Sequence, residues 1–164
     1  MIVVDLGCMP HNNDRSVEPL IERFQPEVLF GFDPHPDLVE GIEVIAGTVV
    51  VRRRMAAWLH DGTVPLKVDG ICTGVDGDGP VRAQCFSLIS FLRTLTVDGL
   101  VLKLDVEGGE YPLLADVAGA DLDLRLGRVL VEWHTGTFAH GFETERPSLR
   151  CPVEAWSLTS RRSS

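Results

Sequence analysis

The sequence predicts an α/β fold built on a doubly wound, mostly parallel sheet, and three observations support this. Apolar runs of strand length open the chain and recur along it, as expected for strands buried on both faces. Segments in which apolar residues recur at helical spacing separate several of these runs. Polar residues follow directly after several runs, at the edge where open parallel sheets bind ligands. The 164 residues should form one domain, 1–164, with residues 155–164 as a partly disordered tail.

The first part of the chain predicts a β-α-β-α-β series. Strands are expected over Ile2–Leu6, over Glu27–Phe32 and within Glu43–Arg54. A helix is expected over Asn13–Phe24 and a short helix over Asp37–Gly41. Strands joined in this way by helices are typical of a parallel sheet with helices on both faces.

The middle of the chain has a different pattern. Asp61-Gly62 lies between two strand-like runs, which is a strong signal for a tight hairpin. Gly70–Pro80 is interpreted as a flexible surface loop. A calcium site there is disfavoured, because Pro80 stands where an EF-hand loop needs an oxygen ligand. The remaining elements are expected as helices over Ser87–Leu95 and Tyr111–Val117, and as strands over Leu100–Leu104, Arg128–Trp133 and Val153–Leu158, the last at a sheet edge.

Charge and composition exclude several classes of partner. The formal net charge of −9 opposes binding to nucleic-acid phosphates and fits poorly with anionic membranes. No apolar run approaches the roughly 18 residues of a membrane-spanning helix, and no secretory signal is recognised. The four cysteines form no CxxC pair, which argues against a zinc site. We therefore expect a cytoplasmic protein with reduced thiols.

Five predicted strands end in residues suited to a binding site, and all five ends should meet at one edge of the sheet. These ends are Asp5-Leu6-Gly7, Asp33, Ala56-Ala57-Trp58, Asp105-Val106-Glu107 and Glu132-Trp133-His134. Asp33 is placed where nucleotide-type folds hold ribose hydroxyls with a carboxylate, or it could cap the following turn. Ala57 and Trp58 could flank an adenine ring, although a tryptophan at such a position often serves packing alone.

Six segments occur in a fixed order over about residues 2–134: VVDLG, GFDPHPDLVE, AAWLHDGTVPL, FSLISFL, LKLDVEGGEYPLL and VLVEWH. Together they resemble the FkbM-type methyltransferases, a branch of the class I S-adenosylmethionine-dependent methyltransferases. The hallmark is KLDVEGGE, which is similar to the family's signature of Lys, hydrophobic, Asp, hydrophobic, Glu, Gly, small residue and Glu.

The resemblance implies a Rossmann-like sheet of seven strands with an antiparallel last strand. It also implies that Asp5, Gly7, Asp33 and the Ala57–Trp58 region hold S-adenosylmethionine. The expected reaction is methyl transfer to a hydroxyl oxygen, often on a sugar or other small metabolite.

The chain departs from this family in two places. Gly7 is the only glycine in the turn DLGCMPHNND, where family members usually have a glycine-rich turn, so contacts to the methionyl tail should differ. About 30 residues follow His134, which is short for the last two strands. We therefore expect either a sheet that is truncated at its C-terminal strands or a pocket that a partner subunit completes, which leaves room for a homodimer.

Asp105, Glu107 and His134 are the candidate catalytic residues. Methyl transfer to an alcohol needs alignment of the acceptor oxygen and a base for its proton. His134 is the histidine best placed for proton transfer, with a pKa expected near working pH. Glu110 should mainly favour the N-terminus of the next helix. Asp105, Glu132 and His134 could share a divalent metal, but nothing in their spacing demands it and no metal is assigned.

Two other classes of protein stay open. A catalytically inactive relative could bind S-adenosylmethionine, or nothing, within an assembly, and the altered turn after Asp5 favours it. A nucleotide-sugar or nicotinamide enzyme on a similar sheet should have phosphate-cradling glycines, which this sequence lacks.

Overall fold

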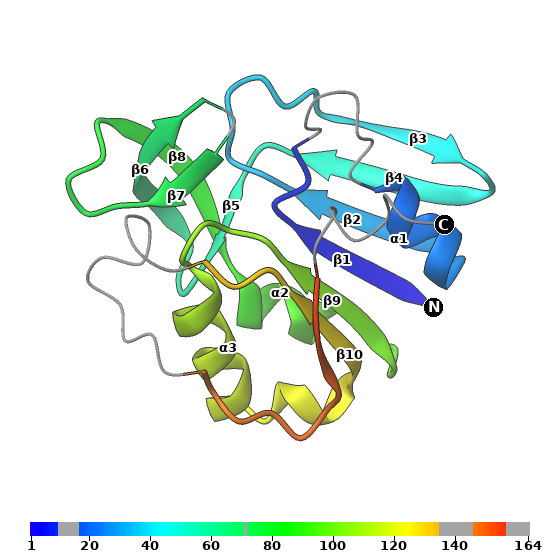
Figure 1. Ribbon diagram of the computed structural model, residues 1–164. Coiled ribbons are helices and arrows are strands. Elements are labelled where there is room, and N and C mark those ends of the chain that lie inside the picture. The colour runs from blue at the N-terminus through cyan, green and yellow to red at the C-terminus, as the bar shows by residue number, and fades with distance from the viewer. Residues whose placement is uncertain (10–16, 71, 135–145, 157–164) are drawn as a thin grey trace.

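The computed structural model describes residues 1–9, 17–70, 72–134 and 146–156, which form an α/β fold with two sheets (Figure 1). The larger sheet has seven strands in the order β11-β10-β9-β1-β2-β4-β3, and only β3 runs antiparallel to its neighbour. Its strands are β1 (Ile2–Leu6), β2 (Val28–Phe32), β3 (Gly41–Ile45), β4 (Thr48–Arg53), β9 (Leu100–Leu104), β10 (Leu126–Val131) and β11 (Val153–Ala155). The helices are α1 (Glu18–Phe24), α2 (Leu88–Thr94), α3 (Glu110–Gly119) and the short 3₁₀ helix η1 (Leu122–Arg125).

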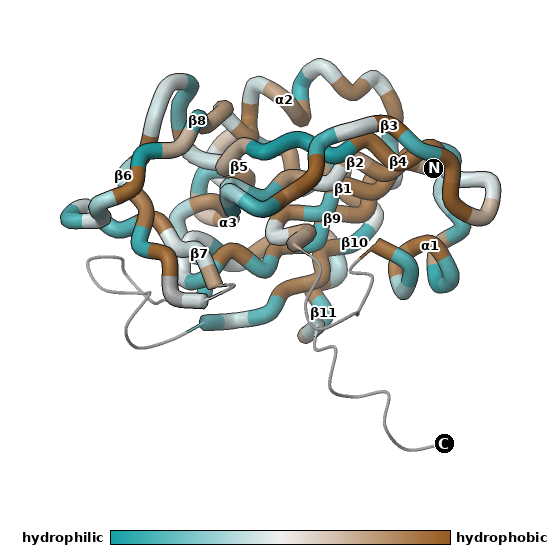
Figure 2. The backbone as a smooth tube through the Cα atoms, turned by 90° about the horizontal axis from the view of Figure 1, so that it is seen from above, coloured by the Kyte–Doolittle hydropathy of each residue, from teal (hydrophilic) through white to brown (hydrophobic). Residues whose placement is uncertain are grey.

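The larger sheet is covered on both faces, because its central strands are apolar on both sides. Figure 2 shows α1 on one side of these strands and α2 on the other. Val3 packs in the cluster with α1, whereas its neighbour Val4 packs in the cluster with α2 and α3. Every residue of β9 is buried. This two-sided burial is the reason why the predicted central strands are continuous apolar runs.

The predicted helix over Asp37–Gly41 is wrong, and the predicted third strand is two strands. β3 and β4 form an antiparallel hairpin that turns at Ala46 and Gly47, where φ is +49° and +87°. Two consecutive positive φ values are typical of a tight hairpin turn. β4 is parallel to β2, so the parallel order survives although no second helix lies between them. The expected helix over Asn13–Phe24 is confirmed over Glu18–Phe24, and residues 13–16 lie outside the described part.

The second sheet has the strand order β5-β8-β6-β7, which corrects two predictions. Its strands are β5 (Ala56–Trp58), β6 (Gly62–Asp69), β7 (Cys72–Val75) and β8 (Val81–Ser87). Asp61-Gly62 is not a hairpin, because β5 pairs with β8 and not with β6. Asp61 instead accepts a hydrogen bond from the backbone N–H of Ser87 at 2.9 Å, which joins this turn to the start of α2. Gly70–Pro80 is not a loop throughout, because it contains β7.

The expectation of an antiparallel last strand is wrong for the described residues. β11 runs parallel to β10, and the antiparallel strand is β3 at the opposite edge. The predicted edge strand over Val153–Leu158 is confirmed over Val153–Ala155, and residues 157–164 of the expected tail lie outside the described part. Glu154 in β11 forms ion pairs with Arg23 of α1 and Arg128 of β10, so the short strand is anchored to both. The larger sheet has the seven strands that the resemblance implies, but it reaches this number only because the segment expected to be one strand forms two, β3 and β4.

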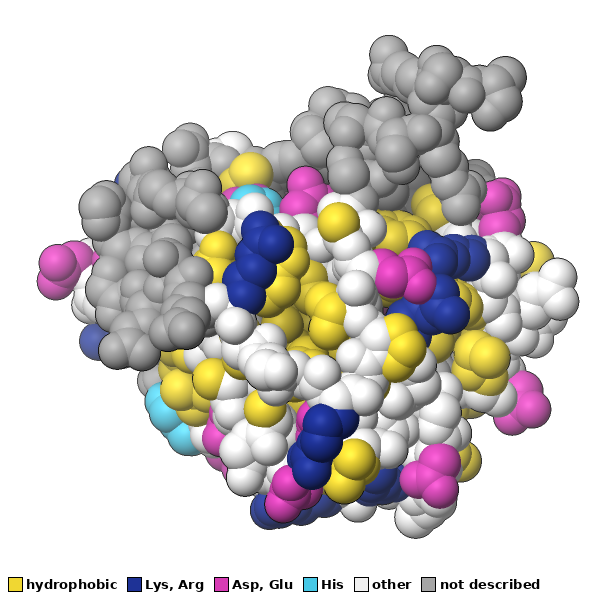
Figure 3. Space-filling model, turned by 60° about the horizontal axis from the view of Figure 1, so that its bottom comes forward, with side chains coloured by type: hydrophobic (Ala, Val, Ile, Leu, Met, Phe, Trp, Pro, Cys, Tyr) yellow, Lys and Arg dark blue, Asp and Glu magenta, His cyan; other side chains and the backbone are white. Residues whose placement is uncertain are grey.

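Two further observations concern the described residues as a whole. None of their helices is long and apolar enough to cross a membrane. No disulfide joins the four cysteines, and Cys85 is buried in the core of the second sheet. On the face drawn in Figure 3, Lys and Arg side chains stand in separate groups among acidic and hydrophobic side chains.

Candidate active site

A cavity of about 330 Å³ lies at the carboxyl ends of β1, β2, β9 and β10, where the sequence places its candidate site. Every predicted catalytic or cofactor-binding residue lines this cavity except Asp5, which is buried beneath it. The predicted residues that line it are Gly7, Asp33, Ala57, Trp58, Asp105, Glu107 and His134. The strand ends therefore bring together side chains from distant parts of the chain, as predicted.

A buried ion-pair chain forms the floor of the cavity and accounts for Lys103 inside a core strand. The Lys103 Nζ lies 3.0 Å from Asp5 Oδ1 and 3.2 Å from Asp105 Oδ2, and it donates a hydrogen bond to the Gly7 carbonyl at 2.8 Å. Burial alone would lower the pKa of Lys103, but the charges of Asp5 and Asp105 raise it above its ordinary value. Burial raises the pKa of Asp5 from 3.8 to about 6 despite the neighbouring ammonium. Both groups are therefore charged at neutral pH.

Gly7 is required by the backbone around this ion-pair chain. Its φ is +85°, in the left-handed region that favours glycine. A Cβ at this position would lie 1.8 Å from the Asp105 carbonyl oxygen. The sequence predicts a glycine that turns beside a ligand, and Gly7 does line the cavity. The close contact that excludes a side chain at Gly7, however, is with the Asp105 backbone and not with a ligand.

Asp33 organises the loop that follows β2 and also faces the cavity. Its Oδ1 accepts a hydrogen bond from the His35 backbone N–H at 2.8 Å, and its Oδ2 accepts one from the Met9 N–H at 3.1 Å. Burial raises the pKa of Asp33, although both hydrogen bonds lower it. The alternative role as a turn cap is therefore present in the structure. A carboxylate has about four acceptor positions, so both oxygens keep capacity for hydroxyl donors.

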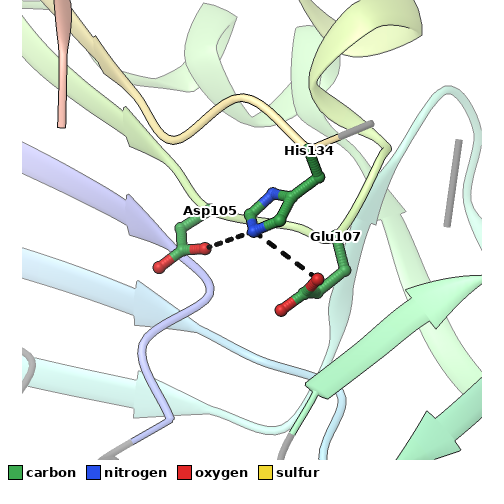
Figure 4. Close-up of side chains that lie close together, drawn as sticks. All are labelled: Asp105, Glu107 and His134. Atoms are coloured by element: carbon green, nitrogen blue, oxygen red, sulfur yellow. Dashed lines mark ion pairs between the residues drawn. The ribbon is translucent and has the colours of Figure 1, made fainter. Parts of the chain in front are cut away.

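The three predicted catalytic side chains lie together at the cavity wall (Figure 4). The Nε2 atom of His134 lies 3.7 Å from Asp105 Oδ1 and 3.5 Å from Glu107 Oε2. The three side chains come from two strand ends and point toward one another, with the imidazole between the carboxylates.

The pKa expected for His134 is wrong. Burial lowers the pKa, but the hydrogen bond to Glu110 and the charges of Glu110, Glu107 and Asp105 outweigh it and raise the pKa to about 9. At neutral pH the side chain is therefore an imidazolium, which has no lone pair with which to accept a proton. The carboxylates are left as the groups that could act as a base.

Glu110 has a larger role than the helix-terminal one predicted from sequence. It is fully buried, and its carboxylate accepts hydrogen bonds from the backbone N–H groups of Val106 at 3.0 Å and Gly108 at 2.9 Å. Its Oε1 also lies 2.8 Å from the Nδ1 of His134. Glu110 thus holds the turn that carries Glu107, whose φ is +52°, and orients the imidazole toward the cavity. The spacing of 24 residues between Glu110 and His134 gave no signal of this contact.

The metal alternative involves a different set of residues from the one considered at first. Donor atoms of Asp105, Glu107 and His134 all lie within 4.8 Å of one another, a spacing that could hold a metal cation. The protonated imidazole already supplies a positive charge between the two carboxylates. Glu132 lines the same cavity, and burial followed by the charge of Asp105 raises its pKa. In the loop that was considered for calcium, Asp76 accepts a hydrogen bond from the Asp78 backbone N–H, which is the arrangement of an ordinary turn.

The second sheet supplies the part of the cavity wall that sequence reasoning missed. Leu66, Cys72, Thr73 and Val75 line the cavity together with Ala57 and Trp58 of β5. Cys72, Thr73 and Val75 fall in the segment predicted to be a surface loop. The β-branched residues within CTGV were the available signal for a strand. Trp58 is buried and packs close to Gly109, so its packing role is present.

Comparisons with known proteins give no relative for this chain: no family model, no curated protein and no solved structure matches it.

The charge state of His134 leads to a prediction about pH and stability. Its pKa of about 9 in the folded state lies above its ordinary value of 6.5, so its contribution is fully present below pH 6.5 and is lost as pH rises through 9. The side chain is partly exposed, so we expect a contribution of roughly 2 kcal/mol. Unfolding of the wild type and His134→Gln should be compared in denaturant between pH 6 and pH 10. A difference in stability that stays constant over this range would contradict the charged pair.

Proposed function

We propose that the protein is an S-adenosylmethionine-dependent O-methyltransferase that acts on a hydroxyl group of a sugar or other small metabolite. The observation that carries the proposal is the charge of the cavity. Carboxylates of Asp33, Asp105, Glu107 and Glu132 line it, and His134 is the one cationic side chain among the described lining residues. A cavity of this sign favours a sulfonium cation and repels phosphate groups. The alternative of a nicotinamide or nucleotide-sugar enzyme is therefore disfavoured.

The residues present also fit the rest of the methyl donor. Asp33 lies at the end of β2 with spare acceptor capacity for ribose hydroxyls. Ala57 and Trp58 add apolar contact surface to the same cavity. The larger sheet, parallel apart from β3, supports a Rossmann-like class I methyltransferase fold, in which ligands bind at the carboxyl ends of the strands. The turn expected to contact the methionyl tail is described only as far as Met9.

The chemistry that we propose for this chain is alignment and proton removal. Bound S-adenosylmethionine would supply an activated methyl group on a sulfonium sulfur for transfer to the acceptor oxygen, with the thioether as leaving group. Glu107 is the better candidate to receive the hydroxyl proton, because Asp105 is tied to Lys103 at 3.2 Å. The imidazolium of His134 holds the two carboxylates in place.

Ligand binding provides the direct test. S-Adenosylmethionine or S-adenosylhomocysteine should raise the thermal midpoint of the wild type, since a ligand that binds only the folded state stabilises it. At a ligand concentration of 100 times Kd the stabilisation is about 2.7 kcal/mol. Asp33→Asn should lose most of this shift, because one ribose acceptor is replaced by an amide donor. Absence of a shift in the wild type would refute the cofactor assignment, and a full shift in the variant would refute the ribose contact.

A catalytically inactive relative is the second candidate, and the altered turn DLGCMPHNND, in which Gly7 is the only glycine, favours it. A thermal shift with S-adenosylmethionine, together with no methyl transfer to any of a panel of free sugars and phenols, would select this candidate.

A further inference from the structure

Thr73 is exceptional among the buried hydroxyl groups of the described residues. The buried Ser and Thr side chains are Thr48, Thr73 and Ser87. Thr48 donates a hydrogen bond to the Pro26 carbonyl at 2.7 Å, and Ser87 accepts one from the Ser90 N–H at 3.2 Å. The Oγ1 atom of Thr73 is buried and has no hydrogen-bond partner among the described residues. A buried hydroxyl without a partner costs free energy, so its presence calls for a reason.

The surroundings of Thr73 suggest that reason. Thr73 lines the cavity from β7, and the strand register pairs it with Val68 and pairs Val75 with Leu66. Directly paired residues and residues two apart lie on the same face of a sheet, so these four side chains share one face. Three of the four are apolar. Thr73 therefore contributes a single hydroxyl to an otherwise apolar wall.

Ligand sites commonly combine apolar walls with a few polar groups that fix the orientation of the ligand. A rotation by about 120° around χ1 of Thr73 would carry its hydroxyl to another staggered position, from which it could meet a ligand in the cavity. The carboxylates of Asp105, Glu107 and Glu132 line the same cavity. A molecule in the cavity would therefore find both an apolar wall with one hydroxyl and carboxylate acceptors for hydroxyl protons.

We propose that Thr73 and the apolar wall of the second sheet form the acceptor subsite, and that the acceptor is an uncharged ring compound with at least two hydroxyl groups and no phosphate. The ring packs against Leu66 and Val75. One hydroxyl bonds to Thr73, and another reaches the carboxylates. A phosphate or carboxylate on the acceptor would be repelled by the carboxylates that line the cavity. The role of the bound compound as a methyl acceptor rests on the proposed methyltransferase function, whereas the preference of the cavity for such a compound does not.

The test uses cis-1,2-cyclohexanediol and cyclohexyl phosphate as probes, with binding followed by ligand-observed NMR in the absence of S-adenosylmethionine. The wild type should bind the diol at least tenfold more tightly than the phosphate. Thr73→Val should weaken diol binding about five- to tenfold, the value of one hydrogen bond. Thr73→Ser keeps the hydroxyl and is the matched control, so it should bind the diol like the wild type.

Stability distinguishes a ligand-binding hydroxyl from a structural one. If Thr73 has no internal partner, Thr73→Val should unfold at the same temperature as the wild type or higher in the absence of ligand. A lower midpoint for Thr73→Val, unchanged diol affinity in that variant, no diol binding by the wild type or a preference for the phosphate would each overturn the proposal. A failure to bind S-adenosylmethionine would instead refute the proposed function and leave these affinities unaffected.

Discussion

Replacement of Lys103 by Met is expected to destabilise the folded protein by about 3–5 kcal/mol, because it leaves the buried Asp5 carboxylate without a counter-charge. The Lys103 ammonium lies 3.0 Å from Asp5 and 3.2 Å from Asp105, and both Lys103 and Asp5 are buried. Methionine has a similar shape, so the loss should come from charge and not from packing. Denaturant unfolding at pH 7.5 measures it.

The matched control is the double variant Asp5→Asn/Lys103→Met, which removes both charges and should recover more than half of the loss. The dependence on pH gives a second check. Burial holds the pKa of Asp5 above its ordinary value, so protonation of Asp5 favours the folded state. The loss in Lys103→Met should therefore shrink as pH falls from 8 to 5. A double variant no more stable than the single one would show that the ion pair is not the cause.

Replacement of Glu107 by Gln is expected to lower the rate of methyl transfer by about 10²–10⁴, the usual contribution of a positioned general base. The fold should be little affected, because Gln has the same shape and, within the described part of the chain, the Glu107 carboxylate accepts no backbone hydrogen bond of the kind that Glu110 accepts. Most of the thermal shift with S-adenosylmethionine should be kept, since Glu107 supplies only one of the four carboxylates that line the cavity. The measurement is single-turnover transfer from labelled S-adenosylmethionine to an accepted hydroxyl compound.

Glu132→Gln is the control for Glu107→Gln, because Glu132 lines the same cavity and also carries a carboxylate. It should lose at most about tenfold if its charge contributes only to the field of the cavity. Equal losses in the two variants would point to cavity charge as the source of the rate. An active Glu107→Gln would leave Asp105 as the base.

The central strands could be predicted because each is an apolar run that is buried on both faces, as in Leu100–Leu104. Which strands pair with one another could not be predicted from the sequence. Asp61-Gly62 has the residues of a hairpin turn, but β6 pairs with β8, whose residues come some 20 positions later. Local turn preference was outweighed there by pairing within the second sheet. In the same way, the regular alternation of strands and helices suggested a helix over Asp37–Gly41, where the structure has no helix and β3 begins at Gly41.

The candidate site was predictable as far as strand ends determine it. Asp33, Asp105 and His134 follow separate parallel strands, so their convergence follows from topology alone. The charge of His134 could not be foreseen, because it depends on Glu110, which reaches back over its own turn to bond the imidazole. Thr73 was missed for a similar reason, since its role depends on which strand faces the cavity.

The residues proposed to bind the methyl donor and those proposed to bind the acceptor come from different parts of the chain. The lining carboxylates follow strands of the larger sheet, whereas Thr73 and its apolar neighbours Leu66 and Val75 belong to Gly62–Ser87, one continuous segment. If the two halves hold donor and acceptor as proposed, selectivity for the acceptor is encoded in a single exchangeable cassette. Mutations or grafts within that cassette could then retune which hydroxyl compound is methylated while the residues that hold the methyl donor stay unchanged.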